Sequence, residues 1–133
     1  MSLLLARAAV NDANIHFDRL YSYLIPAQLV GKVYPGSMVL VPFGRGNKAR
    51  MAVVLAVEEA EETDAPQRLK SLYDAAPEEA RLTPDLLELV RFLKERTFCT
   101  WFEAVKAVIP YGAQYRPATV DGRPVMQSRL TRS

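Results

Sequence analysis

The stretch Ser37-Met-Val-Leu-Val-Pro-Phe43, followed after a short polar turn by Ala49-Arg-Met-Ala-Val-Val-Leu-Ala-Val57, decides the fold of this chain. Both runs have the length and composition of strands, and the turn at residues 44–48 contains two glycines, so the sequence predicts a β-hairpin. Pro35-Gly36, just ahead of it, suits a type II turn. The second strand is apolar on both faces and small-sided on one. We therefore expect a tightly curled sheet or a small barrel.

Three further segments around this hairpin are predicted to be strands. Residues 3–10 form an almost uninterrupted apolar run, which is typical of a buried strand. Residues 19–25 are rich in aromatic and β-favouring side chains, and strand alternation puts Tyr21 and Tyr23 on the same face. Residues 69–73 fit a short fifth strand. We therefore expect five to six strands in one antiparallel sheet.

Helix signals are concentrated in the second half of the chain. Thr83-Pro84-Asp85 supplies an N-cap, a proline at the first helical position and an early acid. Apolar residues at helical spacing follow, so a helix begins here. Thr100-Trp101-Phe102-Glu103 is a capping box, and it predicts a second helix that ends near Val108. The expected fold class is therefore α+β, with a small curled antiparallel sheet or barrel followed by two helices.

The chain is organised as one domain with a C-terminal extension. Residues 1–110 contain every predicted strand and helix, and 133 residues suffice for one ordinary core. Residues 58–67 are acidic, and we interpret them as a solvated loop. From Tyr111 onward, hydrophobic periodicity stops, and proline, glycine and arginine dominate. We therefore interpret residues 111–133 as a tail, or as a linker toward a following domain.

The inventory of reactive residues excludes most catalytic classes. One cysteine, Cys99, and one histidine, His16, cannot form a zinc site of several cysteines or histidines. The sequence contains no G-x-x-x-x-G-K-[ST] stretch for a phosphate-binding ATPase loop and no nucleophile elbow. We therefore predict that this chain is not an enzyme by itself, and that it needs no metal and no cofactor.

Charge and hydropathy limit the partners of the chain. No apolar run approaches the ~20 residues that span a bilayer, and a single cysteine fits a reducing cytoplasm, so we expect a cytoplasmic protein without a membrane partner. Residues 1–57 carry six Lys and Arg side chains against two Asp side chains, whereas residues 58–64 carry five acidic side chains. This segregation allows one basic face, but the net charge of +2 disfavours a protein that coats DNA non-specifically.

Five motifs follow one another in a fixed order between residues 3 and 110. They are Phe17-Asp-Arg-Leu-Tyr-Ser-Tyr-Leu-Ile-Pro26, Pro35-Gly-Ser-Met-Val-Leu-Val-Pro-Phe-Gly44, Arg68-Leu-Lys70, Leu82-Thr-Pro-Asp-Leu86 and a helix that ends in Ile109-Pro110. This series resembles the N-terminal domain of the PriA helicase family of bacterial replication restart. The resemblance covers only the opening module of that helicase, because the winged helix, the two ATPase lobes and the zinc-binding cysteines have no counterpart in this sequence.

The resemblance implies a specific site. In the PriA family this domain binds the 3′ end of the nascent leading strand at a stalled or branched replication fork, in a pocket for the terminal nucleotide. Tyr21 matches the aromatic residue of that pocket, Gly44 its glycine and Lys70 its lysine. Ser22 stands where the family has an acid. A carboxylate accepts a strong hydrogen bond from a 3′-hydroxyl, whereas a serine hydroxyl bonds it neutrally and more weakly.

The residue types at these positions suit DNA on chemical grounds as well. A tyrosine ring stacks on a terminal base, a glycine lets backbone approach a ligand, and a lysine faces a phosphate. Each also has an ordinary structural role, in a core, a turn or a solvated strand face. Arg45, Lys48 and Arg50 cluster at the hairpin, where they either contact further phosphates or protect a sheet edge.

Three functions remain open at this point. The first is a module that binds 3′-ended strands of branched DNA. The second is a protein-interaction domain that docks onto the remainder of the helicase or onto primosome and replisome proteins, without useful DNA affinity. The third is a small-barrel binder of single strands with no preference for an end. Dependence on a 3′ end discriminates among them, because only the first function requires it.

Overall fold

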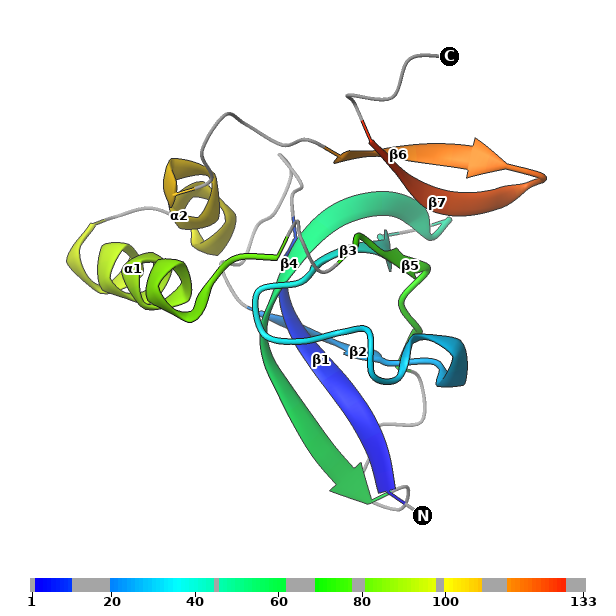
Figure 1. Cartoon of the computed structure of the whole chain (residues 1–133), viewed down its shortest axis with the longest axis horizontal. Helices are drawn as coiled ribbons and strands as arrows, with labels where there is room; N and C mark the ends of the chain where they lie inside the picture. Colours follow the sequence, from blue (N-terminus) through cyan, green and yellow to red (C-terminus); the bar gives the residue numbers. More distant parts are fainter. Residues whose placement is uncertain are drawn as a thin grey trace.

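The computed structural model of this protein describes residues 2–10, 20–44, 46–61, 69–77, 81–97, 100–108 and 115–128. The predicted α+β class is confirmed: a five-stranded antiparallel sheet is followed by two helices (Figure 1). In chain order the elements are β1 (Ser2–Val10), β2 (Tyr21–Leu24), the 3-10 helix η1 (Ala27–Leu29), β3 (Met38–Phe43), β4 (Lys48–Glu61), β5 (Asp74–Ala75), α1 (Pro84–Arg96), α2 (Trp101–Val108), β6 (Tyr115–Val120) and β7 (Arg123–Ser128).

The main sheet stays open, which corrects the expectation of a curled sheet or barrel. Its strand order is β2-β1-β4-β3-β5, so β2 and β5 are the two edges. An isolated bridge between Leu24 and Ser71, and not a paired strand, connects the β2 edge to the described chain that leads into β5. The two-sided apolar pattern of β4 has another cause. Helices α1 and α2 lie on one side of the sheet and η1 on the other, so separate layers bury the two faces (Figure 1).

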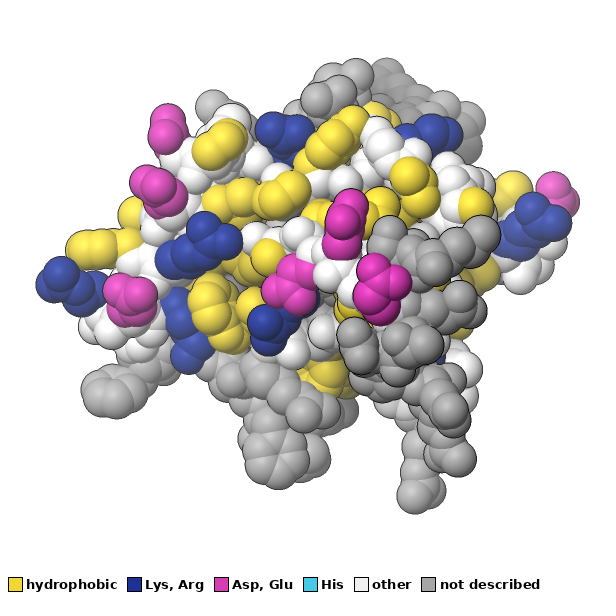
Figure 2. Space-filling model, turned by 90° about the horizontal axis from the view of Figure 1, so that it is seen from below, with side chains coloured by type: hydrophobic (Ala, Val, Ile, Leu, Met, Phe, Trp, Pro, Cys, Tyr) yellow, Lys and Arg dark blue, Asp and Glu magenta, His cyan; other side chains and the backbone are white. Residues whose placement is uncertain are grey.

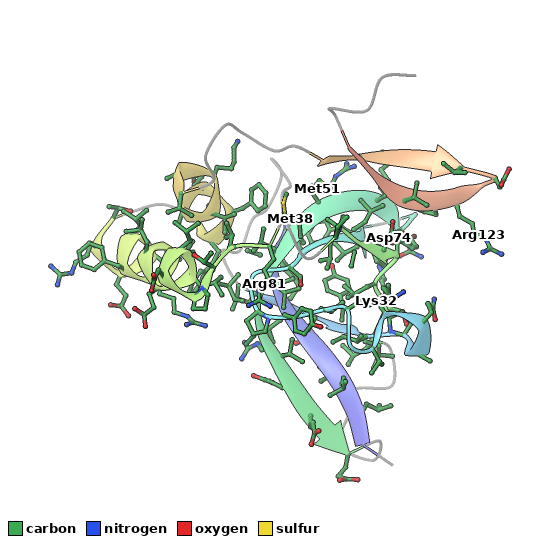
Figure 3. All side chains as sticks on the ribbon, viewed as in Figure 1. Lys32, Met38, Met51, Asp74, Arg81 and Arg123 are labelled. Carbon is green, nitrogen blue, oxygen red and sulfur yellow. The ribbon has the colours of Figure 1, made fainter. Side chains whose placement is uncertain are left out.

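The helix side of the sheet carries one apolar core. Leu40, Val53 and Leu55 of the sheet are almost completely buried, together with Val90 of α1 and Val105 of α2. Met38 and Met51 belong to the same core and are labelled in Figure 3.

The caps of the two helices are as the sequence predicts. The backbone N–H of Leu86 donates to Oγ1 of Thr83 at 3.3 Å. The capping box is reciprocal, because the backbone N–H groups of Thr100 and Glu103 each donate to the other residue's side chain at 3.1 Å. These bonds satisfy donors that the first helical turn leaves without partners.

The opposite side of the sheet carries a second core. It contains Val39, Val41 and Val54 of the hairpin and Tyr23 of β2, all of them buried. The chain after β2 covers them with Ile25, Leu29 and Val33. This covering segment ends at the predicted turn of Pro35-Gly36. Gly36 has φ +97°, and the N–H of Ser37 donates to the carbonyl of Tyr34 at 2.9 Å.

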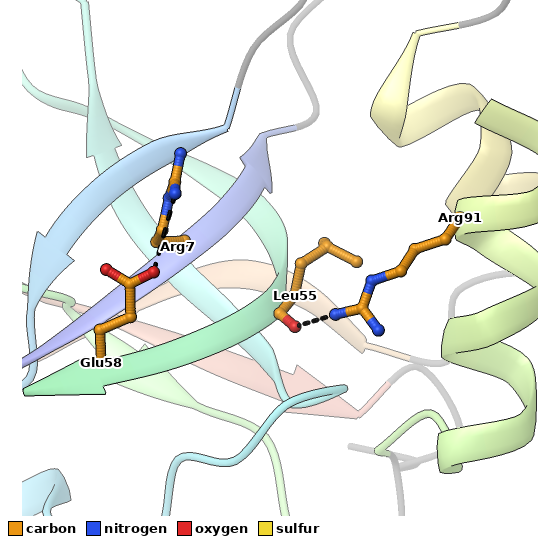
Figure 4. Close-up of polar contacts among 4 residues, drawn as sticks. All are labelled: Arg7, Leu55, Glu58 and Arg91. Atoms are coloured by element: carbon orange, nitrogen blue, oxygen red, sulfur yellow. Dashed lines mark hydrogen bonds and ion pairs between the residues drawn. The ribbon is translucent and has the colours of Figure 1, made fainter. Parts of the chain in front are cut away.

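Strand β4 is longer than predicted and contains a bulge. Residues 58–61, which the sequence suggested to be part of a loop, pair with β1 instead. Arg7 pairs with Ala56 and Ala8 with Val54, so Leu55 is the extra residue. Its carbonyl accepts a hydrogen bond from Nη2 of Arg91 at 3.0 Å (Figure 4). The α1 side chain thus satisfies a backbone group that the bulge leaves out of the ladder.

The predicted fifth strand lies later in the chain than expected. Residues 69–73 contribute only the bridge at Ser71, and β5 is formed by residues 74–75. The whole stretch 69–77, which we call the bridging segment, is fixed by backbone hydrogen bonds to both sheet edges. The N–H of Leu24 donates to Lys70, and the N–H groups of Leu72 and Tyr73 donate to Leu24 and Leu40, at 2.8 to 3.0 Å.

The C-terminal extension contains a β-hairpin that the sequence analysis did not predict. Strands β6 and β7 pair in a two-stranded sheet that lies against β3, β4 and β5. Asp121 and Gly122 form its turn, both with positive φ, as a type I′ hairpin turn requires. The sequence did not indicate these two strands because Pro117 interrupts the first and Pro124 the second. In the part of the chain that the structure describes, no helix is long and apolar enough to cross a membrane.

Candidate functional site

A pocket lies where the β2 edge, the end of β3 and the bridging segment meet. Its volume is about 440 Å³, which falls within the ~300–1,000 Å³ range of small-ligand sites. The residues that line it are Tyr21, Ser22, Tyr23, Pro42, Phe43, Gly44, Leu69 and Lys70. Four of the residues named from the sequence, Tyr21, Ser22, Gly44 and Lys70, therefore surround one cavity although three separate chain segments supply them.

Aromatic rings form one wall of this pocket. Tyr21 and Phe43 pack edge to face, with ring centroids 5.1 Å apart and planes at 89°. Cross-strand pairing sets Ala8 opposite Tyr21 and Ala6 opposite Tyr23, and these short side chains leave room for the rings. Tyr21 and Phe43 remain only partly buried, so they present aromatic surface on which a flat base can stack.

Tyr23 has a different role from its neighbour in the wall. Its side chain is buried to 4 % exposure in the second core. Burial, and then the neighbouring Tyr21, raises the pKa of the Tyr23 hydroxyl well above its ordinary value. The group therefore stays neutral at any physiological pH. We interpret Tyr23 as a buried side chain that supports the neighbouring Tyr21.

Gly44 and Lys70 form the polar side of the pocket. Gly44 has φ +71°, a conformation that other residues rarely adopt, and no atom lies within 4 Å of the position that a Cβ would occupy. Its backbone is therefore open to a ligand. Nζ of Lys70 donates to the carbonyl of Gly44 at 3.4 Å. A lysine ammonium has three N–H donors, so this contact leaves two for an anion.

Ser22 lines the pocket with its backbone, at the outer edge of β2. It pairs with Arg7 in β1, so alternation puts its hydroxyl on the opposite sheet face from the ring of Tyr21. The backbone groups of Leu24 bond outward to the bridging segment. Those of Ser22, two residues earlier on the same edge strand, face the same way. Ser22 thus offers the pocket a backbone N–H and C=O, a contribution that sequence reasoning missed.

The predicted basic cluster is only partly described. Lys48 pairs with Phe43 and Arg50 with Val41 across the hairpin, which puts both cations on the pocket side of the sheet. Nη1 of Arg50 donates to the carbonyl of Ala49 at 3.3 Å. Arg45, the third member, lies outside the described residues, as do His16 and Cys99.

Phe43 is a pocket residue that was not singled out from the sequence. It directly precedes Gly44, and alternation along β3 puts it on the same face as Val39 and Val41. The sequence signal that could have identified Phe43 was therefore its position at the end of a strand, directly before a glycine turn.

Charge elsewhere on the molecule is mixed. Figure 2 shows one face on which Lys and Arg side chains are scattered from the helical end to the opposite end, with acidic side chains among them at the helical end and near the middle. The acidic end of β4 contributes Glu58, Glu59 and Glu61, and Glu58 pairs with Arg7 at 3.7 Å between exposed side chains (Figure 4). Since acids repel phosphates, this face is a poor general surface for DNA.

Comparisons with known proteins assign the chain to a family. The family model of the PriA 3′DNA-binding domain matches residues 9–110. The chain belongs to this family. It is 29 % identical over 100 residues to the replication restart protein PriA of Chlamydia trachomatis, and 30 % identical over 107 residues to that of Bacillus subtilis.

The match to the PriA relatives covers most of this chain but little of theirs. The alignments cover 73 % and 79 % of this chain, but each covers only 13 % of the relative. The chain therefore spans about an eighth of the length of these PriA proteins. The match extends over β2, the hairpin, the bridging segment and both helices, which are the elements that build the pocket and its support.

Proposed function

We propose that this member of the PriA 3′DNA-binding domain family binds the 3′-terminal nucleotide of a DNA strand in the pocket between β2, β3 and the bridging segment. One observation carries the proposal. Tyr21, Gly44 and Lys70, separated by up to 49 positions in the numbering, line a single cavity of about 440 Å³. They bring together an aromatic ring, an open backbone and an ammonium, which are the groups that a terminal nucleotide requires.

Each group has a distinct task in the proposed mechanism. The terminal base stacks on the partly exposed ring of Tyr21, which Phe43 supports at 5.1 Å. The ammonium of Lys70, oriented by the carbonyl of Gly44, bonds the phosphate of the last nucleotide. The backbone edge of Ser22 bonds the 3′-hydroxyl. Because stacking and backbone contacts read no base sequence, we expect little preference among the four bases.

The neutral backbone groups of Ser22 set the strength of end selection. A neutral hydrogen bond contributes about 0.5–1.5 kcal/mol, and one to a charged group about 1.5–3 kcal/mol. Selection for a hydroxyl at the 3′ end therefore depends here on shape and neutral hydrogen bonds. A 3′-phosphate would add bulk and negative charge in front of the Ser22 carbonyl, which repels it.

The wider setting of this binding is part of the proposal. By analogy with the PriA relatives, the chain would deliver a 3′-ended strand of branched DNA to helicase machinery in the cytoplasm during replication restart. The other partners would be the remainder of such a helicase and primosome or replisome proteins. We assign the chain recognition and not catalysis, since its sequence carries no ATPase phosphate-binding loop.

Titration of fluorescent DNA with a recessed 3′ end tests this function. We expect DNA with a 3′-hydroxyl to bind about tenfold more tightly than the same DNA with a 3′-phosphate, at low salt. Lys70→Ala should weaken binding to the hydroxyl DNA by about tenfold, as expected for loss of a charge-assisted phosphate contact. Lys106→Ala on α2 is the matched control, because Lys106 is also exposed but α2 packs on the other side of the sheet.

Two results would contradict the proposal and favour the other functions. Equal binding of both DNAs would indicate a general strand binder that acts through its basic side chains, Arg45, Lys48, Arg50 and Lys70. Absence of binding by a folded sample would favour protein docking. The exposed Leu89 and Phe92 of α1 are the nearest candidates for a docking surface, although the guanidinium of Arg96 lies 4.9 Å from the Phe92 ring centroid and covers part of it.

A further inference from the structure

A second pocket lies farther along the bridging segment. Its volume is about 330 Å³, and its lining includes Gly31, Lys32 and Tyr34 of the chain after η1, together with residues 74–77. Figure 3 shows Lys32 and Asp74 near each other, close to η1 and β5. The bridging segment therefore forms a wall of both pockets, with residues 69–70 in the first and residues 74–77 in the second.

The second pocket contains an aromatic ring held in a fixed orientation. The guanidinium carbon of Arg81 lies 5.1 Å from the ring centroid of Tyr34. The Tyr34 hydroxyl donates to the carbonyl of Gly31, and its backbone N–H donates to Oγ of Ser37 at 2.8 Å. A ring fixed at both ends loses little conformational entropy when a base stacks on it.

The polar groups of the second pocket suit a phosphate and a base edge. Lys32 is exposed, and its ammonium forms no ion pair with the described residues. Gly31 has φ +83° with no atom within 4 Å of a Cβ position, so its backbone is open in the same way as that of Gly44. Asp74 adds an acidic residue to the lining of this pocket.

The pairing state of the bases indicates which strand supplies the second nucleotide. A base can stack on the Tyr34 ring only if it is unpaired. In DNA with a recessed 3′ end, the strand that ends there is paired up to its terminal nucleotide, whereas the template strand continues beyond it unpaired. The occupant of the second pocket therefore belongs to the template strand, opposite the 3′ end.

We infer that the pocket of Lys32, Tyr34 and Asp74 binds an unpaired nucleotide of the template strand, just beyond the point where the recessed 3′ end stops. This inference rests on the proposed function, because the first pocket must hold the 3′ end to bring the template strand within reach. The domain would then recognise the junction between duplex and single strand, and not the 3′ end alone.

Two DNAs with the same duplex and the same 3′-hydroxyl test the inference. One has a single-stranded 5′ template overhang, and the other is blunt. We expect the wild-type protein to bind the overhang DNA about tenfold more tightly, since one further base is stacked. Lys32→Ala should remove this gain and leave affinity for blunt DNA within about twofold. Lys70→Ala should weaken both DNAs equally, and Lys106→Ala should change neither.

A second readout locates the contact. In a titration followed by NMR, the Gly31 amide should shift only with overhang DNA, whereas the Gly44 amide should shift with both DNAs. Equal affinity of the wild-type protein for the two DNAs would overturn the inference, as would an unchanged overhang gain in Lys32→Ala. Failure of the proposed function is distinguishable, because it would abolish the preference for a 3′-hydroxyl over a 3′-phosphate on both DNAs.

Discussion

The two faces of the main sheet have opposite characters, although the same strands form both. The helix face is closed, with Leu40, Val53 and Leu55 packed against Val90 and Val105. The other face has an equally buried centre, but at its edge the aromatic rings are only partly covered.

The difference between the faces separates stability from binding. On the helix face, each contact buries apolar area or satisfies a backbone group, so substitutions there should lower the free energy of unfolding. At the pocket edge, the exposed groups contribute little to folding and are available to a ligand. Substitutions there should change DNA affinity and leave folding nearly intact. The predictions below test this separation, from the largest effect to the smallest.

Gly36→Ala should be the most damaging change. A Cβ at this position would lie 2.2 Å from the carbonyl oxygen of Leu82, and φ is +97°. We expect the free energy of unfolding to fall by about 3 kcal/mol, from the clash and the backbone strain together. Gly46→Ala is the matched control, because Gly46 has φ +81° but open space around it, and it should cost about 1 kcal/mol. Equal losses in urea unfolding of the two variants would contradict the role of the clash.

Tyr21→Leu should break binding without breaking the fold. Loss of the stacking surface should weaken affinity for 3′-ended DNA by about tenfold or more, since a stacked base contributes about 1–3 kcal/mol. The midpoint of urea unfolding should fall only slightly. Tyr21→Phe keeps the ring beside Phe43 and should bind as the wild type does. A Phe variant as weak as the Leu variant would show that the hydroxyl, and not the ring, is the binding group.

Thr100→Ala should show the converse behaviour on the helix face. It removes one half of the capping box, and we expect a loss of about 1 kcal/mol in the free energy of unfolding. DNA affinity should remain unchanged, because α2 packs on the other side of the sheet. Glu103→Gln preserves an acceptor for the Thr100 N–H and serves as the control. A change in DNA affinity that accompanies Thr100→Ala would mean that the two faces are coupled.

Lys48→Ala should have a modest effect that salt reveals. If Lys48, opposite Phe43, contacts one phosphate, its loss should reduce the slope of log affinity against log salt by about 0.7 to 0.9. The affinity should fall uniformly for all base sequences. Titrations at several salt concentrations measure the slope, and an unchanged slope would remove Lys48 from the interface.

Ser22→Ala should have the smallest effect. Strand register puts its hydroxyl on the face of Arg7, and only its backbone groups face the pocket. We therefore expect affinity for a 3′-hydroxyl end to change by less than about twofold. A tenfold loss would mean that the serine hydroxyl replaces the family's acid directly.

Local sequence patterns predicted a large part of this molecule. The two apolar runs on either side of the glycine turn at residues 44–48 identified the hairpin, Pro35-Gly36 identified a turn, and the caps at Thr83 and Thr100 identified both helix starts. Such signals are local, because a cap or a turn depends on residues within one turn of chain. The motif series also named Tyr21, Gly44 and Lys70 before their proximity was visible.

The errors in the main sheet concern contacts between segments that are distant in the sequence. Residues 58–61 are polar and looked like a loop, yet pairing with β1 makes them a strand. The fifth strand lies at residues 74–75 and not at residues 69–73, because pairing with Val39 and Leu40 of β3 fixes it there. Strand propensity is weak compared with the hydrogen bonds that a neighbouring edge offers.

The sequence by itself determined four strands of the main sheet, both helices and which residue types could meet a nucleotide. Only the tertiary structure decided that the sheet stays open, that Arg91 satisfies the bulged carbonyl of Leu55, and that the bridging segment forms a wall of two pockets. The physical reason is the range of the interactions. Caps and alternation act between near neighbours, whereas a pocket forms only where packing and hydrogen bonds bring together segments that are far apart in the chain.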